Sequence, residues 1–274
     1  MNQKTGIIIG AIVVVLALGG FGYWFVLGEP EAPSAPIEAI PLDPPTEVAE
    51  AEVVEPEPID VPEEAEEPEV LPTEPPVEPT SEPTAVAEAV EEAVATAITW
   101  GIDSEQSTAR FELDEDLNGE RITVVGVADQ VAGQMRFNAA DLSTAEIGTI
   151  QVNARTFATD NDRRNNAIQN RILQTGDYEF VTFEPTNIVG MPATAAVGGT
   201  VQFDIEGNLT IRDVTLPVTF SAIVDLIDTN TIEGTVATII AYSDFGINVP
   251  QVPVIANVEE ELEIYIDFRA NPVE

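Results

Sequence analysis

The sequence predicts an all-β fold for its larger C-terminal part, preceded by a transmembrane helix and a disordered linker. Three observations lead to this prediction. Residues 6–28 carry no charged side chain, residues 29–95 are rich in proline and glutamate, and residues 96–274 contain short segments in which apolar and polar side chains alternate. Many strands with one helix indicate an antiparallel sheet closed into a barrel or a sandwich. The chain therefore divides into an anchor (1–28), a linker (29–95) and a domain (96–274).

The uncharged run is long enough to cross a membrane. Its 23 residues would form a helix of about 35 Å, against a hydrocarbon core of about 30 Å. Lys4 is the only lysine and precedes the run, so we expect a cytoplasmic N-terminus and an extracytoplasmic domain, periplasmic or at the cell surface. The alternative is a cleaved signal peptide. The bulky Tyr23 and Trp24 at the end of the run favour an uncleaved signal-anchor in the cell membrane.

The linker has a composition that opposes collapse. Residues 29–95 hold 21 acidic residues, 15 prolines and neither lysine nor arginine. Proline removes backbone donors and like charges repel, so we expect residues 29–84 to form an extended, largely polyproline II-like stalk with a maximum reach of about 170 Å. A passive disordered tether is the alternative interpretation.

The composition also excludes several classes of function. The formal net charge is −39, and an acidic surface of this kind repels nucleic acid. The absence of histidine and cysteine rules out catalytic triads and dyads as well as zinc sites with imidazole or thiolate ligands. A hydrolase with paired carboxylates stays open, but no paired motif argues for one. We therefore expect no enzyme, no metal and no cofactor.

Strand-like segments follow one another from Trp100 onward. Asn118-Gly119 matches the signal of a type I′ hairpin turn. The clearest alternation extends over residues 216–226, where every second side chain from Leu216 to Leu226 is apolar. The other predicted strands are 109–113, 122–125, 134–139, 146–155, 178–184, 200–204, 208–211, 232–242 and 261–268. Residues 160–173 predict one helix, capped by Asp160 or Asn161.

An acidic segment, residues 114–119, matches the first half of a calcium-binding loop. The twelfth position of such a loop should be glutamate, but it is Val125 here. An acidic hairpin tip explains the segment better, and we expect no metal there.

The candidate site residues are apolar side chains of the sheet interior and arginines of the predicted helix. Inward apolar side chains either fill the interior or line a cavity, and the periodicity leaves both open. The tentative interior set is Phe137, Phe157, Phe183, Phe203, Val218, Phe220 and Phe245. Arg163, Arg164 and Arg171 either neutralise nearby acids or form a rim that binds an anionic headgroup.

Five short segments, in the right order, resemble the YceI-like family. They are Trp100-Gly101-Ile102-Asp103-Ser104, Phe157-Ala158-Thr159-Asp160, Tyr178-Glu179-Phe180-Val181-Thr182-Phe183, the run from Gly207 to Val218, and Ser243-Asp244-Phe245-Gly246-Ile247. Two positions depart from the family pattern: Glu179 replaces a usual proline and Asp213 replaces a common glycine.

This resemblance implies a lipocalin-like antiparallel β-barrel of about eight strands around an apolar tunnel, with a short helix near one end. It further implies binding of a long apolar partner, an isoprenoid or other lipid, for sequestration or transport. The alternative from another class is a packed structural or adhesion module at the cell surface without a small-molecule ligand.

Overall fold

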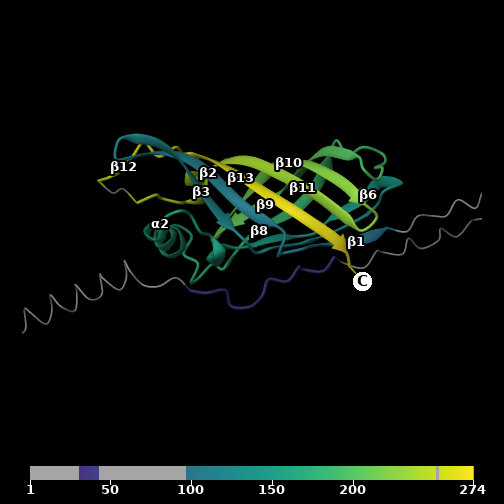
Figure 1. Cartoon of the computed structure of the whole chain (residues 1–274), viewed down its shortest axis with the longest axis horizontal. Helices are drawn as coiled ribbons and strands as arrows, with labels where there is room; N and C mark the ends of the chain where they lie inside the picture. The colour runs from purple at the N-terminus through teal and green to yellow at the C-terminus, as the bar shows by residue number, and fades with distance from the viewer. Residues whose placement is uncertain (1–30, 43–96, 251–252, 274) are drawn as a thin grey trace, which may run out of the picture. The chain divides into compact units, whose positions relative to one another are not determined.

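The computed structural model describes residues 31–42, 97–250 and 253–273. These residues form a curled antiparallel sheet with short helical segments (Figure 1). The strands are β1 (Ile98–Ile102), β2 (Thr108–Leu117), β3 (Glu120–Ala128), β4 (Val131–Ala132), β5 (Gln134–Asn138), β6 (Asp141–Ile147), β7 (Ile150–Asn153), β8 (Phe180–Val189), β9 (Thr200–Ile211), β10 (Val214–Asp228), β11 (Thr231–Ala241), β12 (Ile255–Ala256) and β13 (Glu261–Pro272). The helical segments are η1 (Ala154–Thr156), α2 (Asp162–Ala167), η2 (Ile168–Ile172) and η3 (Tyr242–Phe245).

The sheet curls because β4 and β5, which lie near opposite ends of the strand order, are consecutive in the chain. The strand order is β4-β7-β8-β9-β10-β11-β13-β1-β5-β6. Only Gly133 separates β4, which pairs with β7, from β5, which pairs with β1. A side chain at Gly133 would collide with Ile150. The absence of a side chain at Gly133 therefore permits the chain to pass directly from β4 to β5, and this short connection curls the sheet around the core.

Most of the predicted strands are confirmed. Asn118 and Gly119 have φ values of 53° and 83°, and Leu117 pairs with Glu120 across them, as a type I′ hairpin requires. One prediction was wrong: residues 146–155 do not form a single strand, because β6 ends at Ile147 and β7 begins at Ile150. The predicted pair 200–204 and 208–211 is one continuous strand, β9.

The predicted helix is present in a shorter and less regular form. Asn161 caps α2, where its side-chain oxygen accepts the backbone N–H groups of Arg163 and Arg164. The next residues, η2, form a π-helix in which the Leu173 N–H donates to the carbonyl of Ile168. The helical turn therefore widens toward Leu173 instead of continuing as one α-helix from residue 160.

The core follows the alternation that the sequence predicts. On β10 the side chains of Phe220, Ala222 and Leu226 are buried, whereas those of Thr219 and Ser221 are exposed. Two clusters of buried side chains fill the sheet interior, one around Trp100 and Phe268 and the other around Phe220. This inward face brings the apolar residues of the strands to the site described below.

The predicted anchor, residues 6–28, lies outside the described residues. Within the described part of the chain, no helix is long and apolar enough to cross a membrane. Of the predicted linker, residues 31–42 are described; they form neither helix nor strand and contact the domain. Residues 43–96, which include the remainder of the linker, also lie outside the description.

The packing of β8 on β9 predicts a strong effect of one small substitution. A Cβ atom at Gly207 would lie 2.5 Å from the Glu184 carbonyl oxygen and 2.6 Å from the Phe183 ring. We expect Gly207→Ala to lower the free energy of unfolding by about 1–3 kcal/mol through overpacking, measured by urea denaturation. Gly176→Ala is the control, because its Cβ would lie 3.8 Å from the Glu31 side chain, an ordinary van der Waals distance. Equal stability of the two variants would contradict this packing.

Candidate functional site

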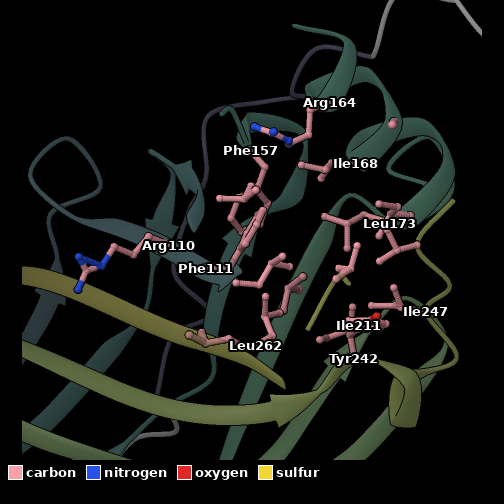
Figure 2. A pocket seen from close by; sticks show the side chains of 18 of the residues that line it. Arg110, Phe111, Phe157, Arg164, Ile168, Leu173, Ile211, Tyr242, Ile247 and Leu262 are labelled. Atoms are coloured by element: carbon pink, nitrogen blue, oxygen red, sulfur yellow. The ribbon is translucent and has the colours of Figure 1, made fainter. Parts of the chain in front are cut away.

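A cavity of about 540 Å³ opens in the interior of the sheet, at the end where α2 and η2 lie. Strands β2, β3, β7, β8, β9, β10 and β13 contribute to its walls, together with α2, η2 and the segment after η3. Figure 2 shows the side chains converging on this space from both sides. The volume falls within the range of about 300–1,000 Å³ that is typical of small-molecule sites.

The walls of the cavity are predominantly apolar. Phe111 of β2 and Phe157 of the segment after η1 lie side by side, with ring centroids 5.6 Å apart (Figure 2). Ile168 and Leu173 cover them from the helical segment, and Leu262 lies on the opposite side. A surface of this kind binds by removing apolar area from water and gives little preference for one orientation of the ligand.

The charged residues that line the cavity are unlike those of the whole chain. They are four arginines, Arg110, Arg163, Arg164 and Arg171, and one acid, Glu115, in a chain with 49 acidic and 10 basic residues. The guanidinium of Arg110 points away from the cavity (Figure 2) and pairs with Glu112 and Asp267, and Arg164 pairs with Glu115. The positive charge at the cavity is therefore that of Arg163 and Arg171, and it favours an anionic group beside them.

Arg164 has a structural role, because it forms ion pairs with two acidic side chains. It lies 3.1 Å from the carboxylate of Glu115 and also pairs with Asp160 at 2.5 Å. Glu115 is only 4% exposed, so its charge requires a partner within the protein. This pair fastens α2 to β2 and fixes the position of the helical segment over the cavity.

Arg163 and Arg171 differ from Arg164. Both are exposed, and both line the cavity. Within residues 31–42, 97–250 and 253–273, neither of them forms an ion pair with an acidic side chain. Their guanidinium groups are therefore free to donate charge-assisted hydrogen bonds to a ligand.

Tyr242 contributes a hydroxyl group to the far side of the cavity (Figure 2). Burial raises the pKa of this phenol, and the nearby charge of Glu260 raises it further. The phenol therefore stays neutral at physiological pH and can act as a hydrogen-bond donor or acceptor.

A second, smaller cavity of about 50 Å³ lies deeper in the interior. Phe183, Phe220, Ile150 and Ile266 line both cavities and so form the partition between them. The rings of Phe183 and Phe220 meet edge to face, with centroids 4.8 Å apart. This aromatic pair sets the inner end of the larger cavity.

The structure brings together part of the predicted site. Phe157, Phe183 and Phe220 line the large cavity, as do all three arginines of the predicted rim, and Phe203 lines the small one. Phe137 instead stacks on Trp100, with ring centroids 5.4 Å apart. Val218 and Phe245 pack in the core cluster around Phe220 and line neither cavity.

Several lining residues escaped the sequence analysis. Phe111 belongs to the alternating segment 109–113, which could have identified it as an inward residue. Ile168 and Leu173 lie on the predicted helix next to the arginines. Val249 and Val254 come from an irregular segment, in which no periodicity indicates the direction of a side chain.

The negative charges of the acidic hairpin tip are partly neutralised by an arginine. Asp114 and Asp116 both lie 3.6 Å from the guanidinium of Arg121. Over the described ranges of the chain, no three acidic side chains converge as metal ligands would.

The comparisons with known proteins agree with this architecture. The polyisoprenoid-binding domain from Saccharophagus degradans, implicated in plant cell wall breakdown, is similar with a TM-score of 0.50 at 13% identity, covering 64% of this chain and 99% of that one. BcnA from Burkholderia cenocepacia is similar with a TM-score of 0.50 at 17% identity, covering 62% of this chain and 99% of that one. At these identities the likeness establishes the fold alone. No curated protein matches the chain.

The family model described as "YceI-like domain" matches residues 100–270. The match covers more than half of the chain and coincides with the curled sheet, and it confirms the resemblance seen in the five sequence segments. Through these residues the chain belongs to the YceI-like domain family.

Proposed function

We propose that the domain binds a long apolar lipid of the isoprenoid class, with its chain in the large cavity and an anionic headgroup at Arg163 and Arg171. The observation that carries this proposal is the apolar cavity of about 540 Å³, whose lining includes Arg163 and Arg171, two arginines without an acidic partner among the described residues. The polyisoprenoid-binding domain of Saccharophagus degradans, which has the same fold, supports the choice of ligand class. The protein then sequesters or carries its ligand and does no chemistry on it.

The energetics favour a long chain over a short one. Each methylene group removed from water contributes about 0.8 kcal/mol, so a chain of fifteen carbons contributes on the order of 12 kcal/mol before costs. Association and ordering cost an estimated 4–15 kcal/mol. Apolar burial alone therefore gives useful affinity only to a long chain, and headgroup contacts add selectivity.

The alternative is a packed structural or adhesion module. A packed interior would retain few voids larger than a water molecule, and the large cavity favours the ligand-binding proposal. The chain also has no histidine or cysteine, which supports binding over catalysis.

We further propose that the protein is anchored in the cell membrane by residues 6–28 and exposes the domain on the extracytoplasmic side. The support is the uncharged run with Lys4 in front of it, together with the positive-inside rule. A lipid-binding domain next to a membrane would lie close to the source of its ligand.

The headgroup proposal predicts a selective loss of affinity. The variant Arg163→Gln/Arg171→Gln should bind farnesyl phosphate about tenfold more weakly or worse, because charge-assisted hydrogen bonds each contribute about 1.5–3 kcal/mol. Its affinity for farnesol, which has the same chain without the charge, should stay unchanged. Both affinities can be measured by displacement of a fluorescent lipid. An equal loss for both ligands, or no loss for either, would contradict the proposed role of these arginines.

The aromatic partition predicts a change in the preferred chain length. Phe220→Ala should join the two cavities and shift the preference toward longer isoprenoid alcohols, with a modest loss of stability. If the interior were a solid core, the same change would lower the free energy of unfolding by about 3–5 kcal/mol. Thermal melting and retained-lipid analysis of this variant distinguish the two. A large loss of stability with no lipid on either protein would support the packed module instead.

The anchor predicts where proteases can reach the chain. Protease added to intact cells, or to spheroplasts where an outer layer blocks access, should cut the chain between residues 43 and 84, whose charge and proline content oppose a stable fold. Denaturing electrophoresis and immunoblotting of cells and medium together detect the shortened domain fragment, whether or not it stays bound to the anchored segment. A domain that stays protected until the cells are lysed would contradict the extracytoplasmic orientation.

A further inference from the structure

Residues 31–42 lie extended on the surface of the domain, and their first part is held by polar contacts (Figure 1). The backbone N–H and the hydroxyl group of Ser34 donate to the two carboxylate oxygens of Glu179, at 2.8 and 2.7 Å. The guanidinium of Arg155 donates to the carbonyl of Ala32 at 3.1 Å and pairs with Glu31 at 2.9 Å. Four contacts within four consecutive residues make this a specific interaction.

The domain holds the receiving groups in place from its own side. Asn153, which is 0% exposed, donates to the Glu179 carboxylate at 3.2 Å. Arg155 lies 3.3 Å from the same carboxylate and donates through Nε to the Thr175 carbonyl at 2.9 Å. Because Glu179 and Arg155 are oriented by the domain, the segment meets a preorganised site and little additional ordering is required.

The last part of the segment is held at a second place. The backbone N–H of Leu42 donates to the side-chain oxygen of Gln134 at 3.2 Å. A Cβ atom on Gly148 would lie 2.9 Å from Cδ2 of Leu42, so the leucine side chain covers this glycine. Pro33, Pro36 and Pro41 restrict the backbone of the segment, which lowers the entropy lost on docking.

The two ends of residues 43–96 meet on one strand. Leu42 contacts Gln134 at the start of β5, and Ile98 pairs with Phe137 on the same strand. Three residues of strand correspond to about 10 Å. The intervening 54 residues, which could reach about 170 Å if extended, therefore leave and re-enter the domain at nearly the same place.

We propose that the surface formed by Gln134, Arg155 and Glu179 is an intramolecular docking site for residues 31–42, which turns the stretch 43–96 from a spacer into a closed loop. Docking does not depend on lipid binding. In the membrane-anchored protein proposed above, only residues 29–30 separate the anchor from the docked segment. Docking therefore holds the domain close to the membrane, and release lets it move away on a long tether.

The charge of Glu179 couples docking to acidity. Burial raises its pKa, but the hydrogen bonds from Ser34, the charge of Arg155 and the hydrogen bond from Asn153 together lower it below its ordinary value. Among these groups only Ser34 leaves with the segment, so the pKa of Glu179 is lower in the docked state than in the undocked one, and docking is favoured where Glu179 is charged. This preference is lost as the pH falls through the pKa of the docked form.

Disulfide trapping in the full chain, purified in detergent micelles, tests the docking. The protein has no cysteine, so Leu42→Cys/Gly148→Cys introduces the only possible pair and leaves Glu31, Ser34, Arg155 and Glu179 intact. We expect this pair to form an intramolecular disulfide at least tenfold faster than Glu38→Cys/Gly148→Cys, whose first cysteine lies about 12 Å further along an extended chain. Adding Glu31→Gln/Ser34→Ala should slow the trapping about tenfold, whereas the matched change Glu38→Gln should not.

Each outcome of this experiment decides the proposal. Equal rates for the two cysteine pairs, or no effect of Glu31→Gln/Ser34→Ala, would overturn the docking site. Disulfide-linked dimers without an intramolecular product would show that the segment binds a second copy, which contradicts a closed loop. Neither result bears on lipid binding, so failure here and failure of the proposed function remain distinguishable.

If Gly148→Cys prevents folding, a distance measurement between two spin labels tests the docking instead. Spin labels on Glu38→Cys and Asp177→Cys occupy exposed positions and avoid the contacts described above. Electron paramagnetic resonance should give a narrow distance distribution for the docked segment. Glu31→Gln/Ser34→Ala should broaden it and move it to longer distances, because the released segment is then no longer held against the domain. A broad distribution before that substitution would overturn the proposal.

Discussion

The ion pair between Arg164 and Glu115 is the interaction on which the site depends. Glu115 lies almost fully buried on β2. Removing Arg164, which among the described residues is the one cation paired with it, would leave an uncompensated charge, at a cost of several kcal/mol. The same pair fastens the short α2 helix, which has no buried residue of its own, to the sheet. The pair acts together with η2, whose buried Ile168 packs in the core and whose Gln169 donates to the Phe157 carbonyl, to place the neighbouring arginines over the cavity.

The strongly acidic composition of the chain makes the lack of acidic partners at Arg163 and Arg171, within the described residues, evidence about the ligand. Acidic residues outnumber basic ones by 49 to 10, so an arginine placed at random on this surface would readily find an acidic partner. Arg155 and Arg121 each have more than one. Arg163 and Arg171 have no acidic partner within the described residues and lie where an apolar cavity meets solvent. This placement is consistent with a ligand that supplies both an apolar chain and a negative charge.

The strands and the inward face of β10 could be predicted because alternation has a fixed period of two. The hairpin at Asn118-Gly119 could be predicted because its turn requires positive φ angles. The break between β6 and β7 could not, since β6 pairs with β5 and β7 pairs with β8, and the sequence does not reveal these different partners. The same limit applies to the site: Phe157, Phe183 and Phe220 belong to it, but periodicity does not distinguish an inward side chain that lines a cavity from one, such as Phe245, that fills the core. Nor could the contact of Ser34 with Glu179 be predicted, because 145 residues separate the partners.

The central claim is that a long apolar molecule occupies the large cavity, and native mass spectrometry of the chain without residues 1–28 tests it most directly. The variant Leu209→Trp serves as the comparison, because it replaces an aliphatic side chain of the cavity wall with a bulky indole ring. The account predicts one bound organic molecule per chain in the original protein, released into organic solvent and identified as an isoprenoid or related lipid, and much less of it on the variant. An unliganded mass for both proteins, or equal amounts of lipid on both, would contradict it.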